Sequence, residues 1–387
     1  MTIDLSLLNQ VTISLDRKSV SIGPGNLWGN VYKKLDAEGL ATSGGRVSDV
    51  GVGGLVLGGG FSFFSPRVGL VCDNVLNYEI VLASGQVTNI NATSNRDLFR
   101  ALKGGSNNFG IVTRFDMKVF PQGKFWGGFL LHPIQLKDQF FKIFENFAKS
   151  KDYDPYAALI HSYSYVPAQG GWFIGSSVYY TKEDANPAVF APFKALPPLT
   201  STTRISNLTD FTIELSTNTP PGGRASFATA TYKNSAKTMS RIYDLTNAIS
   251  PSLANVKDLV FSLSFQPLPQ IVLAPGFATT AGAGNVLGLS AADGDLVNVL
   301  VGGQWSDPAD DAKLDAATRK LFAEIAKVTK EEGTDNPYLY LNYAAEWQKP
   351  IQGYEEEQVR FLRKVSRDVD PGQVFQRLVK GGFKLNA

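Results

Sequence analysis

The sequence is short of the residues that bind metals or cross-link a chain. Its 387 residues include one cysteine, Cys72, and two histidines, His132 and His161. A single cysteine excludes an internal disulfide, and two histidines cannot form a site built on several nearby histidine ligands. We therefore expect no metal centre. Cys72 is expected to be a small buried apolar residue, and His161 is expected to be a sheet histidine with satisfied hydrogen bonds.

Excess charge and long apolar runs are also missing. Lysine and arginine number 37 against 35 aspartates and glutamates, and no long run of like charges occurs, so nucleic acid is not an expected partner. No apolar stretch reaches about 18 residues, the length needed to cross a membrane. Met1–Leu5 has neither the basic start nor the apolar run of a signal peptide. We expect a small-molecule substrate and no membrane partner; the compartment and the oligomeric state are left open.

The first region, residues 1–125, alternates short strands, turns and helices. Its apolar share suits a large core, since 43% of the whole chain is hydrophobic. Strands are predicted at Val11–Leu15, 77–83 and 87–90, and helices over 26–38 and 95–103. Another strand follows Gly110, and the residues predicted to share one of its faces are Ile111, Thr113, Phe115, Met117 and Val119.

The second region, residues 126–335, has longer strands and amphipathic helices. Helices are predicted over 136–147, 236–248 and 309–331, and strands at 156–166, 172–180, 226–232, 259–266 and 297–305. This pattern favours an α+β fold in which helices cover one side of an antiparallel sheet. The remaining residues, 336–387, predict a strand at Tyr338–Tyr343 and a helix from about 355 to 367.

Two glycine-rich loops lie in the first region. Six of the ten residues in 51–60 are glycine, and each glycine costs up to about 1 kcal/mol against alanine. Such a bare backbone suits a flat ligand or a phosphate held against main-chain N–H groups. A second loop spans 104–110. The first loop is neither a dinucleotide fingerprint nor a P-loop. A glycine-rich packing turn explains the first loop as an alternative, and a plain helix-stop loop explains the second equally well.

Three runs, 44–62, 73–85 and 97–113, together resemble the fungal berberine-bridge-like FAD oxidases, and so do the endings 341–344 and 370–375. The resemblance implies a partial FAD-binding domain over 1–125, a substrate domain over 126–335 whose antiparallel sheet lies over the flavin, and a return to the FAD-binding domain over 336–387. It implies cofactor contacts at Gly45, Gly51, Gly53, Gly54, Gly58, Gly59, Gly60, Gly104, Gly105, Gly110, Ile111, Val112 and Asn342.

Members of this family begin with a further lobe that holds the pyrophosphate and often supplies a histidine bonded to the flavin. The sequence starts just after the position of that loop. Neither His132 nor His161 matches the setting of that histidine, and Cys72 does not match the cysteine that some relatives use. FAD, if bound, is therefore expected to be held non-covalently.

Tyr343 is the predicted catalytic residue, beside the flavin ring. A phenol gives up its proton reluctantly at neutral pH, so this role requires a cationic or hydrogen-bonding neighbour. A core or substrate-stacking tyrosine is the alternative. Tyr163, Tyr165, Gln266 and Gln304 are candidates for the substrate pocket, and a purely structural role is open for each.

These observations predict an FAD-linked oxidoreductase that acts on a small organic molecule in fungal secondary metabolism. Two alternatives remain at this point. One is a flavin-free cyclase or other redox-neutral catalyst that has kept the substrate pocket, and the other is a non-catalytic remnant.

Overall fold

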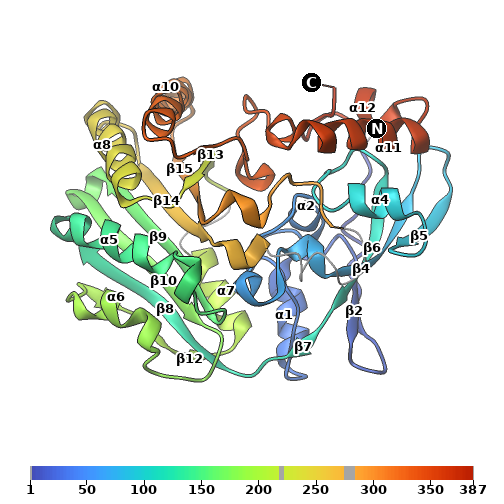
Figure 1. Cartoon of the computed structure of the whole chain (residues 1–387), viewed down its shortest axis with the longest axis horizontal. Helices are drawn as coiled ribbons and strands as arrows, with labels where there is room; N and C mark the ends of the chain where they lie inside the picture. Colours follow the sequence, from blue (N-terminus) through green and yellow to red (C-terminus); the bar gives the residue numbers. More distant parts are fainter. Residues whose placement is uncertain (1, 218–221, 274–283, 387) are drawn as a thin grey trace.

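The chain folds around two large antiparallel sheets, and a small third sheet joins Leu40–Ala41 to Phe120–Pro121. A computed structural model describes residues 2–217, 222–273 and 284–386. The smaller sheet has the strand order β1-β2-β6-β4-β5, and the larger one runs β11-β8-β10-β9-β14-β15-β13-β16, with β12 also paired to β8. Figure 1 shows the blue N-terminal part beside the larger green and yellow sheet, with the red C-terminal helices returning to the N-terminal part. The predicted α+β class with an antiparallel sheet is confirmed.

The smaller sheet and its helices come from the first 121 residues. The predicted strands and helices of this region form close to their expected positions. The elements are β1 (Val11–Ile13), β2 (Ser19–Ile22), α1 (Trp28–Asp36), β3 (Leu40–Ala41), α2 (Val52–Leu57), α3 (Ser65–Val68), β4 (Val75–Val81), β5 (Val87–Asn91), α4 (Arg96–Ala101), β6 (Ile111–Lys118) and β7 (Phe120–Pro121).

One expectation for β6 is wrong. Its residues Phe115 and Met117 are buried as predicted, but the buried residue at the start of the strand is Val112 rather than Ile111 or Thr113. The register against β4 shifts at this point, where Ile80 pairs with Val112 and Glu79 with Arg114. The extra residue is a β-bulge, which reverses the face that each side chain occupies.

The larger sheet is covered by helices on one face. Its long strands alternate between residues packed under α5, α6, α8 and α10 and residues on the opposite face. The elements are β8 (Phe125–Pro133), α5 (Lys137–Phe147), β9 (Ala157–Val166), β10 (Gly171–Tyr180), α6 (Ala191–Ala195), β11 (Thr200–Ser201), β12 (Arg204–Ser206), α7 (Leu208–Thr217), β13 (Arg224–Lys233), α8 (Ala236–Leu253), β14 (Val260–Leu268), β15 (Leu296–Trp305), α10 (Asp311–Glu331) and β16 (Asp335–Asn336).

The C-terminal part returns to the smaller sheet. Helix α11 (Glu356–Val369) packs on α4, and α12 (Val374–Arg377) follows it. The strand predicted at Tyr338–Tyr343 is wrong: residues 337–340 are irregular, and Leu341–Tyr343 forms one turn of 3₁₀ helix. Tyr338 and Tyr340 are nevertheless buried. The apolar residues at alternate positions are therefore buried in the core, although residues 337–340 form no strand.

The structure has two hydrophobic cores, one around the smaller sheet and one around the larger sheet. The first combines the smaller sheet with C-terminal residues such as Leu362, and it also receives Ala158 and Tyr179 from the larger sheet. The second lies between the larger sheet and its helices. Division of the chain at 125 and 335 stays a prediction, since the first core draws on both sides of each boundary. No helix among the described residues is both long and apolar enough to cross a membrane.

Candidate active site

The first glycine loop presents two kinds of glycine. Gly51 and Gly54, at the start of α2, are exposed, and an added Cβ at either would meet nothing within 4 Å. Gly53 is half-buried, with Pro24 at 3.5 Å from such an atom. The N–H groups at the start of a helix have no partner within the helix, and among the residues that the structure describes only that of Val52 is bonded elsewhere, to the carbonyl of Asn26. Bare main chain at 53–54 is therefore open to a ligand.

The other glycines of this loop are packed against the protein itself. A Cβ on Gly58 would lie 2.1 Å from Oδ1 of Asn342, and one on Gly59 would lie 3.1 Å from Leu287. Asn342 Nδ2 donates hydrogen bonds to the carbonyl of Leu55 (3.1 Å) and to the hydroxyl of Tyr340 (3.0 Å). Asn342 and the loop are thus brought together as the resemblance implied, although the protein uses Gly58 to make this contact possible.

The remaining predicted cofactor glycines are also close-packed. Gly45 lies against Trp28, Gly60 against Val71, Gly104 against Leu287 and Gly110 against Ile80. Gly105 approaches the carbonyl of Ala101, Ile111 is half-buried and Val112 is buried. These positions need glycine for internal packing, which the sequence could not separate from a need for ligand contact. Their cofactor roles stay predictions.

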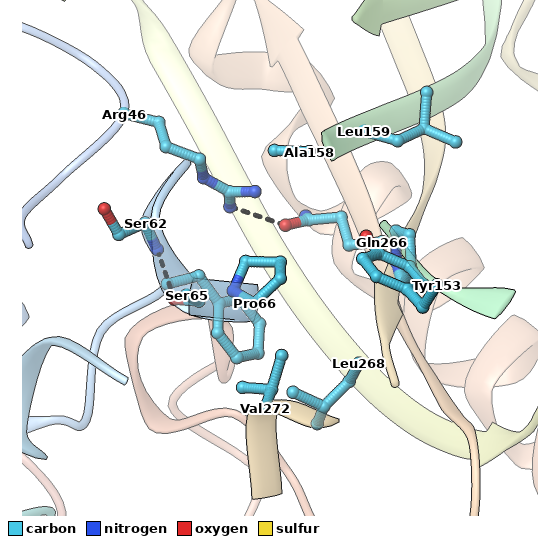
Figure 2. Close-up of a pocket in the computed structure, with 12 residues that line it drawn as sticks. Arg46, Ser62, Ser65, Pro66, Tyr153, Ala158, Leu159, Gln266, Leu268 and Val272 are labelled. Atoms are coloured by element: carbon cyan, nitrogen blue, oxygen red, sulfur yellow. Dashed lines mark hydrogen bonds between the residues drawn. The ribbon is translucent and has the colours of Figure 1, made fainter. Parts of the chain in front are cut away.

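A polar cluster joins the two sheets beside the loop. Arg46 Nη2 donates to Oε1 of Gln266 at 2.5 Å and to the hydroxyl of Tyr343 at 2.8 Å, while Gln266 Nε2 lies 3.2 Å from the same hydroxyl. Figure 2 shows Arg46 reaching across from the N-terminal part to Gln266. Two N–H donors thus converge on the Tyr343 oxygen, and one of them is a cation. This is the neighbour that the predicted catalytic role requires.

A small cavity of about 30 Å³ lies beside this cluster. Arg46 and Gln266 form part of its wall, together with Ser65, Pro66 and Leu268 (Figure 2). Such a volume holds about two water molecules. A ring system is too large for this cavity. The side of the cluster that faces away from it is called the open side.

Tyr343 is also fixed to the larger sheet. Gln348 is buried, and its side-chain amide accepts a hydrogen bond from the N–H of Thr229 at 3.0 Å and donates one to the Thr229 carbonyl at 2.7 Å. The same amide oxygen accepts from the N–H of Ala345. The ring of Phe227, on β13, meets the Tyr343 ring edge-on at 5.8 Å. The segment that carries Tyr343 is therefore held against strand β13.

Three of the residues proposed for the substrate pocket are not brought to this cluster. Tyr163 is fully buried under the helices against Phe141, and Tyr165 lies on the same face. Gln304 lies on the open face, but it pairs with Val260, six residues along β14 from Gln266, which is about 20 Å away. Only Gln266 lies beside Tyr343.

The histidines and the cysteine are buried away from solvent. His161 contacts Ser176 Oγ at 2.9 Å and the Tyr163 hydroxyl at 3.2 Å, and burial lowers its pKa to about 3. His132 is likewise buried, which lowers its pKa. Cys72 is buried beside Asp73, and burial raises the pKa of both groups. Cys72 and His161, the two residues expected to be structural, therefore occupy core positions, and so does His132. The described residues contain no group of three or more potential metal ligands.

The open side of the glycine loop fits part of FAD. The flavin ring is flat and carries hydrogen-bond acceptors along one edge. The bare N–H groups of Gly53 and Gly54 can serve these acceptors, and the half-buried side chains of Leu55 and Leu57 provide apolar contact nearby. Tyr343 lies between this loop and the larger sheet. The residues present thus fit the ring portion of the cofactor.

Sequence reasoning missed Arg46 as a site residue. Arg46 follows Gly44 and Gly45 directly, so the motif included it, but its partners lie 220 and 297 residues away along the chain. A lone arginine after two glycines gives no local sign of such partners. One signal could have pointed to Arg46: Tyr343 needs a cationic neighbour in order to act as a catalytic residue.

Three comparisons agree with this geometry. Residues 1–91 match a family model described as an FAD binding domain. The chain is 38% identical to the FAD-dependent monooxygenase sdcF of Emericella nidulans, over all of this chain and 81% of the relative. It is 36% identical to the FAD-dependent monooxygenase tpcD of Cochliobolus heterostrophus, over all of this chain and 76% of the relative.

Solved structures show the same fold at lower identity. The 6-hydroxy-D-nicotine oxidase of Arthrobacter nicotinovorans superposes with a TM-score of 0.75 at 21% identity, covering 96% of this chain and 80% of that one. The berberine bridge enzyme of Eschscholzia californica gives 0.73 at 15% identity, covering 99% and 80%. The chain belongs to the family of fungal FAD-dependent monooxygenases: it is an FAD-linked oxidoreductase with the berberine-bridge type of fold.

Proposed function

We propose that this enzyme oxidises a small organic substrate on the open side of the Arg46–Gln266–Tyr343 cluster, with FAD held non-covalently against Gly53, Gly54 and Asn342. The observation that carries this proposal is the convergence of Arg46 and Gln266 on the Tyr343 oxygen, beside the bare glycines. When bound, FAD accepts two electrons from a substrate and passes them to dioxygen. The names of the fungal relatives support an FAD-dependent oxidation as the reaction class.

Tyr343 receives the substrate proton in this proposal. The guanidinium of Arg46 stabilises negative charge on the phenol oxygen, and the Gln266 amide fixes the direction of that oxygen. The 30 Å³ cavity behind the cluster admits water to Arg46 and Gln266 but not a second substrate. Arg46 and Gln266 are positioning residues for Tyr343.

Replacement of Gly54 by leucine tests the cofactor position. The side chain meets no protein atom there, and leucine favours a helix over glycine by up to about 1 kcal/mol, so the fold should not be weakened. We expect the leucine to occupy the space of the flavin ring and to raise the dissociation constant for FAD at least about tenfold, a loss of about 1.4 kcal/mol. Flavin fluorescence titration measures this constant.

Gly123→Leu is the matched control. Gly123 is exposed, and an added Cβ there also meets nothing within 4 Å, but it lies outside the loop. FAD affinity should be unchanged in this variant. Equal affinity of Gly54→Leu and the original chain would show that the ring does not lie against Gly54. A folded chain that retains no flavin through gel filtration would instead favour a flavin-free catalyst.

A further inference from the structure

Four serines form a ladder on the open face of the larger sheet, next to the cluster. Ser162 faces Ser264 across β9 and β14, and their hydroxyl oxygens lie 2.7 Å apart. Ser164 faces Ser262 in the next row, at 2.8 Å. On β14 this serine ladder leads through Ser264 directly to Gln266, two residues further along the same face.

Each row of the ladder has hydrogen-bonding capacity to spare. One hydroxyl of a pair donates its proton to the other, so the second proton remains available along with acceptor lone pairs. No further hydrogen bond reaches these hydroxyls from the residues that the structure describes. Serine is not among the residues that strands favour. Residues that do not suit their local secondary structure are expected mainly at functional sites. Ser162, Ser164 and Ser262 are only half-buried.

Aromatic rings lie on both sides of the ladder. The Phe129 ring, from β8, lies over Gly175, so that a Cβ there would be 2.7 Å from it; Gly175 is the neighbour of Ser162 on β10. The Phe227 ring, from β13, lies over Gly302, the neighbour of Ser262 on β15. Glycine inside a strand often marks close approach of another group. Here it lets each ring lean towards the serines.

We infer that the substrate is a flat aromatic compound with hydroxyl or carbonyl groups along one edge. Its oxygens bond to the serine ladder, its ring packs between Phe129 and Phe227, and the end nearest Gln266 reaches Tyr343. This inference rests on the proposed function for the position of the reacting end, but the ladder itself recognises oxygen substituents whether or not flavin is bound.

Binding of two probes tests the inference without turnover. One probe is a dihydroxynaphthalene with both hydroxyls on one edge, and the other is naphthalene. We expect the FAD-loaded chain to bind the first roughly tenfold more tightly, because each neutral hydrogen bond contributes a few-fold to tenfold in affinity. In the double variant Ser162→Ala and Ser264→Ala this preference should fall to about unity. Intrinsic fluorescence titration measures both constants.

The matched control is Ser176→Ala. Ser176 lies on the helix-covered face of β10, bonded to His161, so its loss should leave the preference unchanged. Equal binding of both probes by the original chain, or a preference that survives loss of Ser162 and Ser264, would overturn the inference. Repeating the titration on flavin-free chain separates the two hypotheses: a retained preference supports the ladder even if the chain does not hold FAD, and FAD retention without preference leaves only the proposed function standing.

Discussion

Tyr343→Phe should lower the rate of substrate oxidation by about 10²–10⁴-fold, the usual contribution of a positioned acid or base. The substitution removes one hydroxyl and leaves the aromatic contacts with Phe227 and Tyr340 in place. FAD affinity should be unchanged, because the flavin contacts proposed for Gly53, Gly54 and Asn342 remain. The measurement is the rate of flavin reduction without oxygen, with a substrate that the original enzyme oxidises.

The pH profile distinguishes proton transfer from mere placement of the ring. If Tyr343 takes the proton, the pH dependence of the rate should differ between the original enzyme and Tyr343→Phe. Arg46→Met should also lower the rate, since the guanidinium no longer stabilises negative charge on the phenol oxygen. A Tyr343→Phe enzyme with the original rate would remove Tyr343 from the chemistry.

Acidification from pH 6.5 to 4.5 should destabilise the fold by about 2 kcal/mol through His161 alone. Burial lowers the pKa of His161 to about 3 in the folded chain, so the unfolded chain binds a proton in this range and the folded chain does not. Stability from this group is therefore complete above about pH 6.5 and is lost as the pH falls. Urea unfolding at several pH values measures the slope.

His161→Gln isolates this contribution. Glutamine keeps polar contact with Ser176 and Tyr163 but does not titrate, so the slope should flatten even if the variant is less stable at pH 7. Asp73 acts in the opposite direction, because burial raises its pKa and its contribution to stability is lost as the pH rises. Both chains share Asp73, so the difference between their slopes belongs to His161. Identical slopes would show that His161 does not govern acid unfolding.

Most helices and strands could be predicted from the sequence, because the spacing of their own apolar residues reveals them. Helix α5 carries Phe140, Phe144 and Phe147 on one buried face, as the spacing predicted. Strand β8 was missed, since the consecutive Gly127 and Gly128 in it weaken any strand pattern. Both positions require glycine in the folded chain. A Cβ on Gly127 would meet Tyr179 at 2.4 Å, and Gly128 has a φ of 140°.

The candidate site was only partly predictable. The glycine loop was identified from its composition, Tyr343 and Asn342 were identified through the family resemblance, and Gln266 was one of four pocket candidates. Tyr163 was proposed for the pocket although it points the other way, because a sequence does not say which face of a half-buried strand meets the helices. The serine ladder escaped notice because its members lie on two strands about 100 residues apart, as with the 102-residue separation of Ser162 and Ser264.

Asn342 and Tyr343 are neighbours in sequence, yet they are tied to opposite partners. Asn342 is bonded to the carbonyl of Leu55 on the glycine loop, while the turn after Tyr343 is pinned by Gln348 to β13. The two Cα atoms are about 3.8 Å apart, a span that covalent geometry does not allow to stretch. That single peptide unit therefore fixes the distance between the glycine loop and β13 at this point.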